Sequence, residues 1–245
     1  MRNFKLTIQY DGTKYNGWQK QGNTKNTLQG IFENIISKMF GEEIEVFGSG
    51  RTDAGTHAKG QVANFKCKTD MTANSIKDTI NKYLPKDIVV TECEEKELRF
   101  HSRLNAKSKD YLYIIDNGTN RDVFMKNYAF RVDEKLDIEL MKKATSYFIG
   151  EHDFRAFCSN KRHKKSTVRT IYSIDVSEEN GKIYILFKGN GFLYNMVRIL
   201  VGTLIEIGSS KKSIDDIEKI FKGEDRKDAG FTAPACGLYL MNVYY

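Results

Sequence analysis

The feature of this sequence that most limits its fold is an order of strand-like and helix-like segments that occurs twice. In the first half, apolar and polar residues alternate over residues 4–10, which predicts a half-buried strand. Over residues 28–39 the apolar side chains instead recur at helical spacing and predict an amphipathic helix. Asn26 is the predicted N-cap of that helix, with Gln29 in capping-box position. Further strands are predicted at residues 44–47, 60–67 and 88–93, and a second helix at residues 73–84.

The second half repeats this order, although not the sequence itself. The apolar run from about residue 193 to residue 207 predicts a long, buried helix. Each half then has the β-α-β-β-α-β order of the ferredoxin-like split unit. We therefore predict an α+β protein of two such units, residues 1–105 and residues 106–245, joined into a mixed, largely antiparallel sheet with helices on one side and a cleft between the halves. The other elements predicted in the second half are strands at residues 111–116, 172–176, 183–188 and 238–243, and helices at residues 138–149 and 214–221.

The chain is basic, since 39 Lys and Arg residues against 32 Asp and Glu residues give a formal net charge of +7 over 245 residues. A basic surface attracts polyanions such as RNA, but many basic proteins bind no nucleic acid, so charge alone leaves both open. The four cysteines are far apart and form no CxxC pair, which predicts reduced thiols in a cytoplasmic protein and no metal site. No apolar run approaches the roughly 20 residues of a membrane span, and the polar N-terminal residues do not resemble a signal peptide.

A glycine-rich segment at residues 48–58 interrupts the pattern between two predicted strands. Its glycines allow the backbone to turn tightly and to approach a ligand. Arg51 and Asp53 are two residues apart, so in an extended loop their side chains point the same way and could share a pocket. A solvated glycine turn with a surface ion pair would contain the same residues. A phosphate-binding P-loop is excluded, because the GxxxxGK motif is absent.

Arg198 lies inside the apolar run of the long predicted helix. An unpaired charge in a protein interior costs several kcal/mol, so an inward-facing guanidinium needs an anion beside it. A carboxylate such as that of Asp53, or a phosphate of a substrate, could be that anion. The side chain could instead extend along the helix and reach water.

Two other segments carry side chains suited to RNA. Tyr111 and Tyr113 share one face of a predicted strand, where a tyrosine can stack on an exposed base or can be a core residue with its hydroxyl satisfied. The second segment is a basic run in a predicted loop, which could contact phosphates without reading sequence or could be a solvated cluster of charges. Its residues are Lys161, Arg162, Lys164 and Lys165, with Arg169 close behind.

Short motifs follow one another along nearly the whole chain. The most specific are GRTDAG at residues 50–55, GFLYNMVR at residues 191–198 and TAPACGLYL at residues 232–240. The others are YDG at residues 10–12, GWQ at 17–19, GQVA at 60–63, FHSR at 100–103, KDYLY at 109–113 and AGFTAP at 229–234. In this order and at these positions they resemble the motifs of the TruA family of tRNA pseudouridine synthases.

The resemblance implies an enzyme that isomerises uridine to pseudouridine at positions 38 to 40 of the tRNA anticodon arm. It also implies a duplicated ferredoxin-like fold, a homodimer and no cofactor. By the same resemblance, Asp53 is the catalytic aspartate and nucleophile, and Arg51 is the arginine of the same motif. Tyr111 matches the tyrosine that packs against the target base, and Arg198 matches an arginine whose guanidinium pairs with the catalytic carboxylate.

Four positions depart from the residues that many relatives have: Thr56, Leu104, Asn195 and Phe231 stand where Val, Phe, His and Pro are usual. None of them removes a catalytic group, but the target RNA could differ. Three alternatives therefore stay open. They are the same chemistry on another RNA such as ribosomal RNA, an RNA-binding protein without catalysis, and a uridine-cleaving glycosidase. A glycosidase usually needs a second carboxylate, which the motif does not offer.

Overall fold

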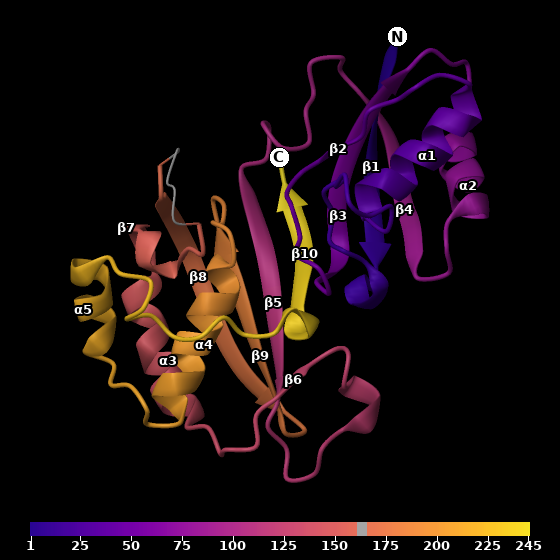
Figure 1. The fold of residues 1–245 in the computed structure, drawn as a ribbon. Helices are drawn as coiled ribbons and strands as arrows, with labels where there is room; N and C mark the ends of the chain where they lie inside the picture. Colours follow the sequence, from indigo (N-terminus) through magenta and orange to yellow (C-terminus); the bar gives the residue numbers. More distant parts are fainter. Residues whose placement is uncertain (161–165) are drawn as a thin grey trace. The chain divides into compact units, whose positions relative to one another are not determined.

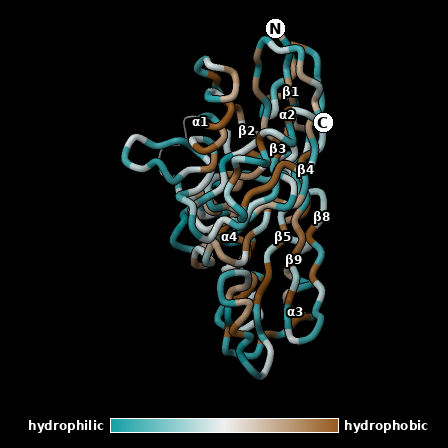
Figure 2. Tube along the Cα trace, turned by 90° about the vertical axis from the view of Figure 1, so that its right-hand side faces the viewer, coloured by the Kyte–Doolittle hydropathy of each residue, from teal (hydrophilic) through white to brown (hydrophobic). Residues whose placement is uncertain are grey.

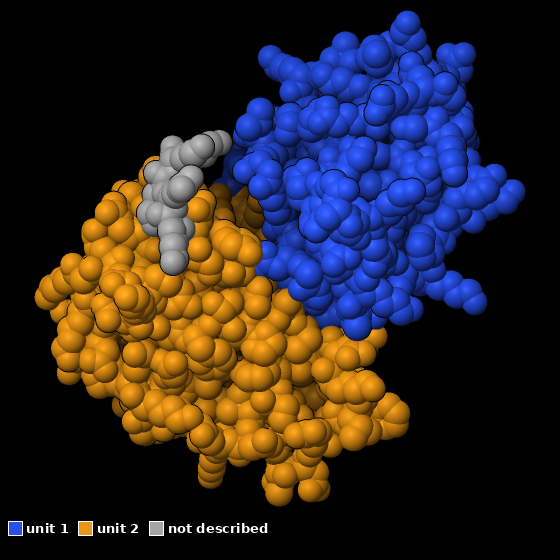
Figure 3. All heavy atoms as spheres, in the orientation of Figure 1, with its two compact units in different colours: residues 1–107, 239–245 blue, residues 108–238 orange. Residues whose placement is uncertain are grey.

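The computed structural model describes residues 1–160 and 166–245, and the predicted alternation of strands and helices is present in both halves of the chain (Figure 1). By their internal contacts the residues divide into two units (Figure 3). Unit 1 comprises residues 1–107 and 239–245, and unit 2 comprises residues 108–238. The division lies two residues beyond the predicted boundary, and the last strand, which we assigned to the second half, is grouped with unit 1.

Unit 1 has the predicted β-α-β-β-α-β order in full. β1 pairs antiparallel with both β3 and β4, and β2 pairs antiparallel with β3. β10 lies parallel to β3, with Tyr239 opposite His57. Phe40 of α1 packs against Phe65 of β3, with ring centroids 6.3 Å apart, so that this helix covers the sheet. The elements are β1 (Arg2–Tyr10), α1 (Leu28–Phe40), β2 (Phe47–Gly48), β3 (His57–Cys67), α2 (Ala73–Tyr83), β4 (Ile88–Lys96) and β10 (Leu238–Tyr244).

In unit 2, β9 pairs antiparallel with β5 on one side and with β8 on the other. Short strands extend both ends: β6 lies parallel to β5, and β7 lies antiparallel to β8. Buried and half-buried residues alternate along β9, whereas β5 is buried at most positions from Asp110 onward. Figure 2 shows that both strands contain hydrophobic residues. The elements are β5 (Ser108–Asp116), β6 (Phe130–Arg131), α3 (Ile138–Thr145), β7 (Gly150–Asp153), β8 (Val168–Glu179), β9 (Lys182–Gly189), α4 (Met196–Gly208) and α5 (Asp216–Gly223).

The core of unit 2 is built around α4, as its apolar sequence predicts. Nearly every residue of this helix is buried, and α3 packs against both α4 and β8. The α+β class is thereby confirmed, and so is the long buried helix. Within residues 1–160 and 166–245, no helix combines the length and the apolar character that a membrane crossing requires.

Several predicted boundaries were wrong. The N-cap of α1 is Thr27, whose hydroxyl accepts a hydrogen bond from the Gly30 N–H, because Thr27 has the extended backbone of a cap. The Asn26 side chain instead donates to the carbonyl of Lys14. Gln29 makes no capping box: its Oε1 accepts the Lys20 N–H. α4 begins at Met196 rather than near residue 193, because Asn195 has a left-handed backbone with φ of 61°.

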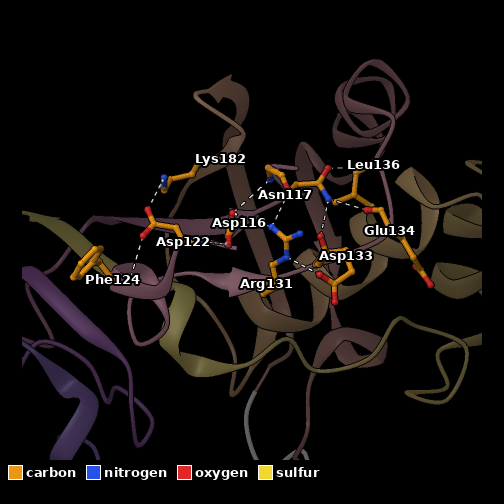
Figure 4. A network of polar contacts seen from close by, with 11 residues as sticks. Asp116, Asn117, Asp122, Phe124, Arg131, Asp133, Glu134, Leu136 and Lys182 are labelled. Carbon is orange, nitrogen blue, oxygen red and sulfur yellow. Dashed lines mark hydrogen bonds and ion pairs between the residues drawn. The ribbon is translucent and has the colours of Figure 1, made fainter. Parts of the chain in front are cut away.

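A polar network fixes the connection between β5 and α3 (Figure 4). The buried carboxylate of Asp116 accepts hydrogen bonds from the N–H groups of Gly118 and Asp122, at 3.4 and 3.2 Å. Arg131 lies 3.3 Å from the same carboxylate and donates to Asp133 at 2.7 Å. Since this segment contains none of the predicted site residues, we regard the network as part of the structural frame of unit 2.

Candidate active site

The GRTDAG segment forms a loop between β2 and β3 whose first residues are tied to β3. Ser49 donates its hydroxyl to Gln61 Oε1 at 2.7 Å and its N–H to the Val62 carbonyl at 2.7 Å. The side-chain amide of Gln61 donates in turn to the Gly50 carbonyl at 3.1 Å. Because Ser49 and Gln61 are fully buried, these bonds are shielded from water and fix the start of the loop.

The rest of the loop lies against residues 10–18, close enough that two positions there must be glycine. A Cβ atom on Gly12 would lie 2.0 Å from the carbonyl oxygen of Thr56, and one on Gly17 would lie 2.5 Å from that of Thr52. Gly17 also has a left-handed backbone, with φ of 85°. The Trp18 N–H donates to the Thr52 carbonyl at 3.0 Å. The YDG and GWQ motifs therefore support the GRTDAG loop directly.

Trp18 connects this loop to the core of unit 1. The indole is 2% exposed and lies 6.2 Å from the ring of Phe32 in α1 and 6.5 Å from that of Tyr10 in β1. The Tyr10 hydroxyl shares a hydrogen bond of 2.8 Å with Thr52 Oγ1. Burial raises the pKa of Tyr10 well above its usual value, so the hydroxyl stays protonated and available for this bond.

Arg51 and Asp53 flank the buried Thr52, with Arg51 exposed and Asp53 half-buried. Arg51 Nε donates to Gln19 Oε1 at 3.0 Å, so the GWQ motif also orients this guanidinium. The Asp53 carbonyl accepts the Thr56 N–H at 3.1 Å and closes the turn that follows it. The backbone on both sides of Asp53 is thus fixed by neighbouring residues.

In unit 2, Tyr111 and Tyr113 share one face of β5 but have different surroundings. Tyr111 is 8% exposed and meets the ring of Phe192 edge-on, with centroids 5.3 Å apart. Tyr113 is fully buried and donates its hydroxyl to the Pro234 carbonyl at 2.8 Å. Burial raises the pKa of Tyr113 well above its usual value. Tyr113 is therefore a core residue with a satisfied hydroxyl.

Arg198 lies in the first turn of α4 and is half-buried, less enclosed than its place in an apolar run suggested. Its Nε donates to the Ala233 carbonyl at 2.6 Å, and its Nη1 donates to Asn195 Oδ1 at 2.9 Å. The backbone of Arg198 takes part as well, since its carbonyl accepts the Ala233 N–H at 3.1 Å. Two acceptors on different nitrogens fix the plane of this guanidinium.

Residues 229–234, which include Ala233, pack closely against α4. A Cβ on Gly202 would lie 1.9 Å from the Phe231 carbonyl oxygen, and the Gly230 N–H donates to Thr203 Oγ1 at 2.9 Å. Arg226 donates to the Gly230 carbonyl at 2.9 Å. The AGFTAP motif is therefore a support for the helix start at Arg198.

Arg169, in β8, is half-buried, and its Nη1 donates to the carbonyls of Ser166 and Val168 at 3.0 and 2.5 Å. Burial lowers the pKa of Arg169 from its usual value. The predicted phosphate-binding residues Lys161, Arg162, Lys164 and Lys165 lie outside the residues that the structure describes. Their contact with RNA stays a prediction.

Comparison with known proteins identifies the family. A family model described as tRNA pseudouridine synthase matches residues 6–105 and 144–245, which is more than half of the chain. The chain belongs to the tRNA pseudouridine synthase family. It is thus an isomerase. Of the site residues, Arg51, Asp53, Arg169 and Arg198 fall within the matched residues, whereas Tyr111 lies between the two matched parts.

Several relatives match this tRNA pseudouridine synthase along its whole length. The tRNA pseudouridine synthase A of Bacillus sp. (strain KSM-64) is 50% identical over 245 residues, with 100% of both chains covered. The tRNA pseudouridine synthase A 2 of Bacillus cereus (strain ZK / E33L) is 47% identical, and the tRNA pseudouridine synthase A of Acetivibrio thermocellus is 46% identical, again with 100% of both chains covered. A crystal structure of a Cbf5-Nop10-Gar1 complex matches with a TM-score of 0.39 and 14% identity, over 97% of this chain and 48% of the other.

Sequence reasoning missed the residues of this synthase that hold the site residues in place. The loop is supported by Gln19, Ser49 and Gln61. Near the start of α4, Ser159 accepts a hydrogen bond from the Asn195 side chain, and Arg226 donates to the Gly230 carbonyl. Their side chains carry ordinary polar chemistry, and all of them except Arg226 bond to partners more than ten residues away along the chain. The one available signal was membership of a motif, as for Gln19 in GWQ.

Proposed function

We propose that this synthase converts uridine to pseudouridine at positions 38 to 40 of the tRNA anticodon arm, with Asp53 as the nucleophile. The observation that carries the proposal is the loop around Asp53. Its backbone is held by buried contacts, while Asp53 itself is only half-buried and Arg51, two residues before it, is exposed. A fixed backbone beneath an accessible carboxylate is what nucleophilic catalysis requires.

One carboxylate is sufficient for this reaction because the substrate and the product have the same atoms. The N1–C1′ bond of uridine breaks, the uracil turns, and a bond forms between C5 and C1′, while the proton on C5 moves to the solvent and N1 gains one. Asp53 either bonds to the nucleotide or removes a proton from C2′, and in both routes it is regenerated. The base must leave its stack to be reached, at a cost of a few kcal/mol.

Other side chains have supporting roles in the proposal. Tyr111 packs against the target base, and Arg198 supplies positive charge to the reaction. Arg51 belongs to the same motif as Asp53. The basic run defined above and Arg169 contact phosphates of the tRNA. The resemblance extends the proposal to a homodimer in the cytoplasm that works without a cofactor, and sedimentation of the purified chain tests the dimer.

Ribosomal RNA is a second candidate substrate, favoured by the departures at Leu104 and Phe231. Both side chains are exposed, at 78% and 39%, so they can contact a bound molecule. The chemistry and the role of Asp53 would be the same. The two substrates are distinguished by which RNA carries the product.

The direct test of the nucleophile is Asp53→Asn, which keeps the shape of the side chain and removes its charge. Isomerisation of tRNA should fall by about 10⁴-fold or more, as for loss of other nucleophiles. The dissociation constant for tRNA should change by less than about threefold, which is under 1 kcal/mol. Residual turnover within tenfold of the wild type would overturn the assignment of Asp53.

A further inference from the structure

Asn195 stands at the N-cap of α4 but does not act as a cap. Its side chain forms no capping hydrogen bond to the backbone within the described part of the chain. An asparagine in this place normally accepts a hydrogen bond from a backbone N–H one turn on. Its φ of 61° is in the left-handed region, which asparagine tolerates better than most residues. The Asn195 side chain therefore makes its hydrogen bonds to other side chains.

The amide of Asn195 lies between a hydroxyl and the guanidinium of Arg198. Its Nδ2 donates to Ser159 Oγ at 2.9 Å, and its Oδ1 accepts from Arg198 Nη1 at 2.9 Å. A guanidinium has only donors, so the amide oxygen must face Arg198 and the amide nitrogen must face Ser159. The backbone repeats this link, because the Ser159 N–H donates to the Tyr194 carbonyl at 3.2 Å. The orientation of the amide is thus determined by its two partners.

This contact has a geometric consequence for Arg198. The Ala233 carbonyl holds Nε, and Asn195 holds Nη1. With one acceptor the planar group could still swing about that bond, whereas two acceptors fix its plane and the directions of its other donors. An arginine that stabilises charge in a reaction must present its donors in one direction before the substrate arrives.

We propose that Asn195 is a positioning residue. Its side chain is held by a hydrogen bond to Ser159 and orients the guanidinium of Arg198 for the isomerisation. The inference rests on the proposed function, in which Arg198 contributes positive charge. Asn195 acts through Arg198 and does not itself touch the substrate. It should therefore affect the rate of the chemical step more than the binding of tRNA.

The test removes the side chain without straining the backbone. Asn195→Gly accepts a left-handed φ, so the helix start is retained. We expect kcat to fall by about ten- to a hundredfold, the range for loss of one hydrogen bond to a charged group, with KM for tRNA changed less than about threefold. Asn195→His, whose ring nitrogen can accept from Arg198 and which tolerates this backbone, should restore kcat to within about threefold of the wild type.

A matched control is Asn180→Gly, because Asn180 also has a left-handed φ, of 52°, and lies exposed in the turn between β8 and β9. Its kcat and KM should equal those of the wild type. If Asn195→Gly also left kcat unchanged, or if it raised KM alone, the positioning role would be refuted.

A double-mutant cycle separates this inference from the proposed function. Arg198→Lys keeps the charge but loses the planar fork of donors, so kcat should fall, and adding Asn195→Gly should lower kcat less than about twofold further. A full additional loss in that background would mean that Asn195 acts elsewhere. If Arg198→Lys lowers kcat and Asn195→Gly does not, only the positioning role fails. If Arg198→Lys has no effect, the proposed role of Arg198 fails and the inference falls with it.

Discussion

The loop around Asp53 is held in part by close backbone contacts, whereas at the start of α4 two of the contacts are hydrogen bonds of the Arg198 guanidinium itself. The Asp53 loop is held by Gly12, Gly17 and Trp18, which approach the carbonyls of Thr52 and Thr56. At the start of α4, Ala233 and Asn195 accept hydrogen bonds from the Arg198 guanidinium. We therefore expect the start of α4 to depend on its arginine side chain for part of its structure, and the loop to depend on the close approach of its backbone to Gly12 and Gly17.

The largest effect is expected from a change to the backbone contacts of the loop. Gly12→Ala places a Cβ 2.0 Å from the carbonyl oxygen of Thr56, which is backbone and cannot rotate away. The free energy of unfolding should fall by about 3 kcal/mol, as for other overpacked sites. Pseudouridine formation should be lost as well, because Thr56 closes the turn after Asp53. Chemical denaturation and a tRNA turnover assay measure the two effects.

Gly22→Ala is the control for that substitution. Gly22 lies on the same connection between β1 and α1, and a Cβ there would meet no atom of the described residues within 4 Å. Its stability should stay within about 0.5 kcal/mol of the wild type. A Gly12→Ala variant as stable as Gly22→Ala would show that close backbone contact does not hold the loop.

The next effect concerns the guanidinium of Arg198 and the carboxylate of Asp53. Arg198→Ala removes the donors to Ala233 and Asn195 and should lower the free energy of unfolding by about 2 kcal/mol, since hydrogen bonds of a half-buried charged group are lost. Asp53→Asn, an isosteric change on a loop held by its backbone, should lower it by less than about 1 kcal/mol. Both variants should be inactive. Equal losses of stability in the two variants would contradict the distinction.

The smallest effect is a gain in stability. Thr56 is 1% exposed, and its Oγ1 has no hydrogen-bond partner among the residues that the structure describes. Thr56→Val should raise the free energy of unfolding by about 1 kcal/mol, because it removes a buried hydroxyl that is not satisfied. Thr203→Val is the matched control: its buried hydroxyl donates to the Ile199 carbonyl and accepts the Gly230 N–H, so this variant should be less stable.

The sequence was informative where its pattern is local. The helical spacing of the apolar residues located α1 and the long apolar run located α4, while the GRTDAG and GFLYNMVR motifs drew attention to Asp53 and Arg198. It misplaced the start of α4, because nothing in an apolar run signals that Asn195 has a left-handed backbone. It also could not show that Gly12 and Gly17 lie against the GRTDAG loop, since that contact joins segments about 40 residues apart and depends on the absence of a Cβ.

The most direct test of the account is mass-spectrometric mapping of pseudouridine in unmodified tRNA and ribosomal RNA transcripts, incubated with the wild-type chain and with Asp53→Asn. We expect pseudouridine at positions 38 to 40 of tRNA with the wild type and none with the variant. Product with both proteins would contradict the role of Asp53, and product on ribosomal RNA alone would contradict the proposed substrate.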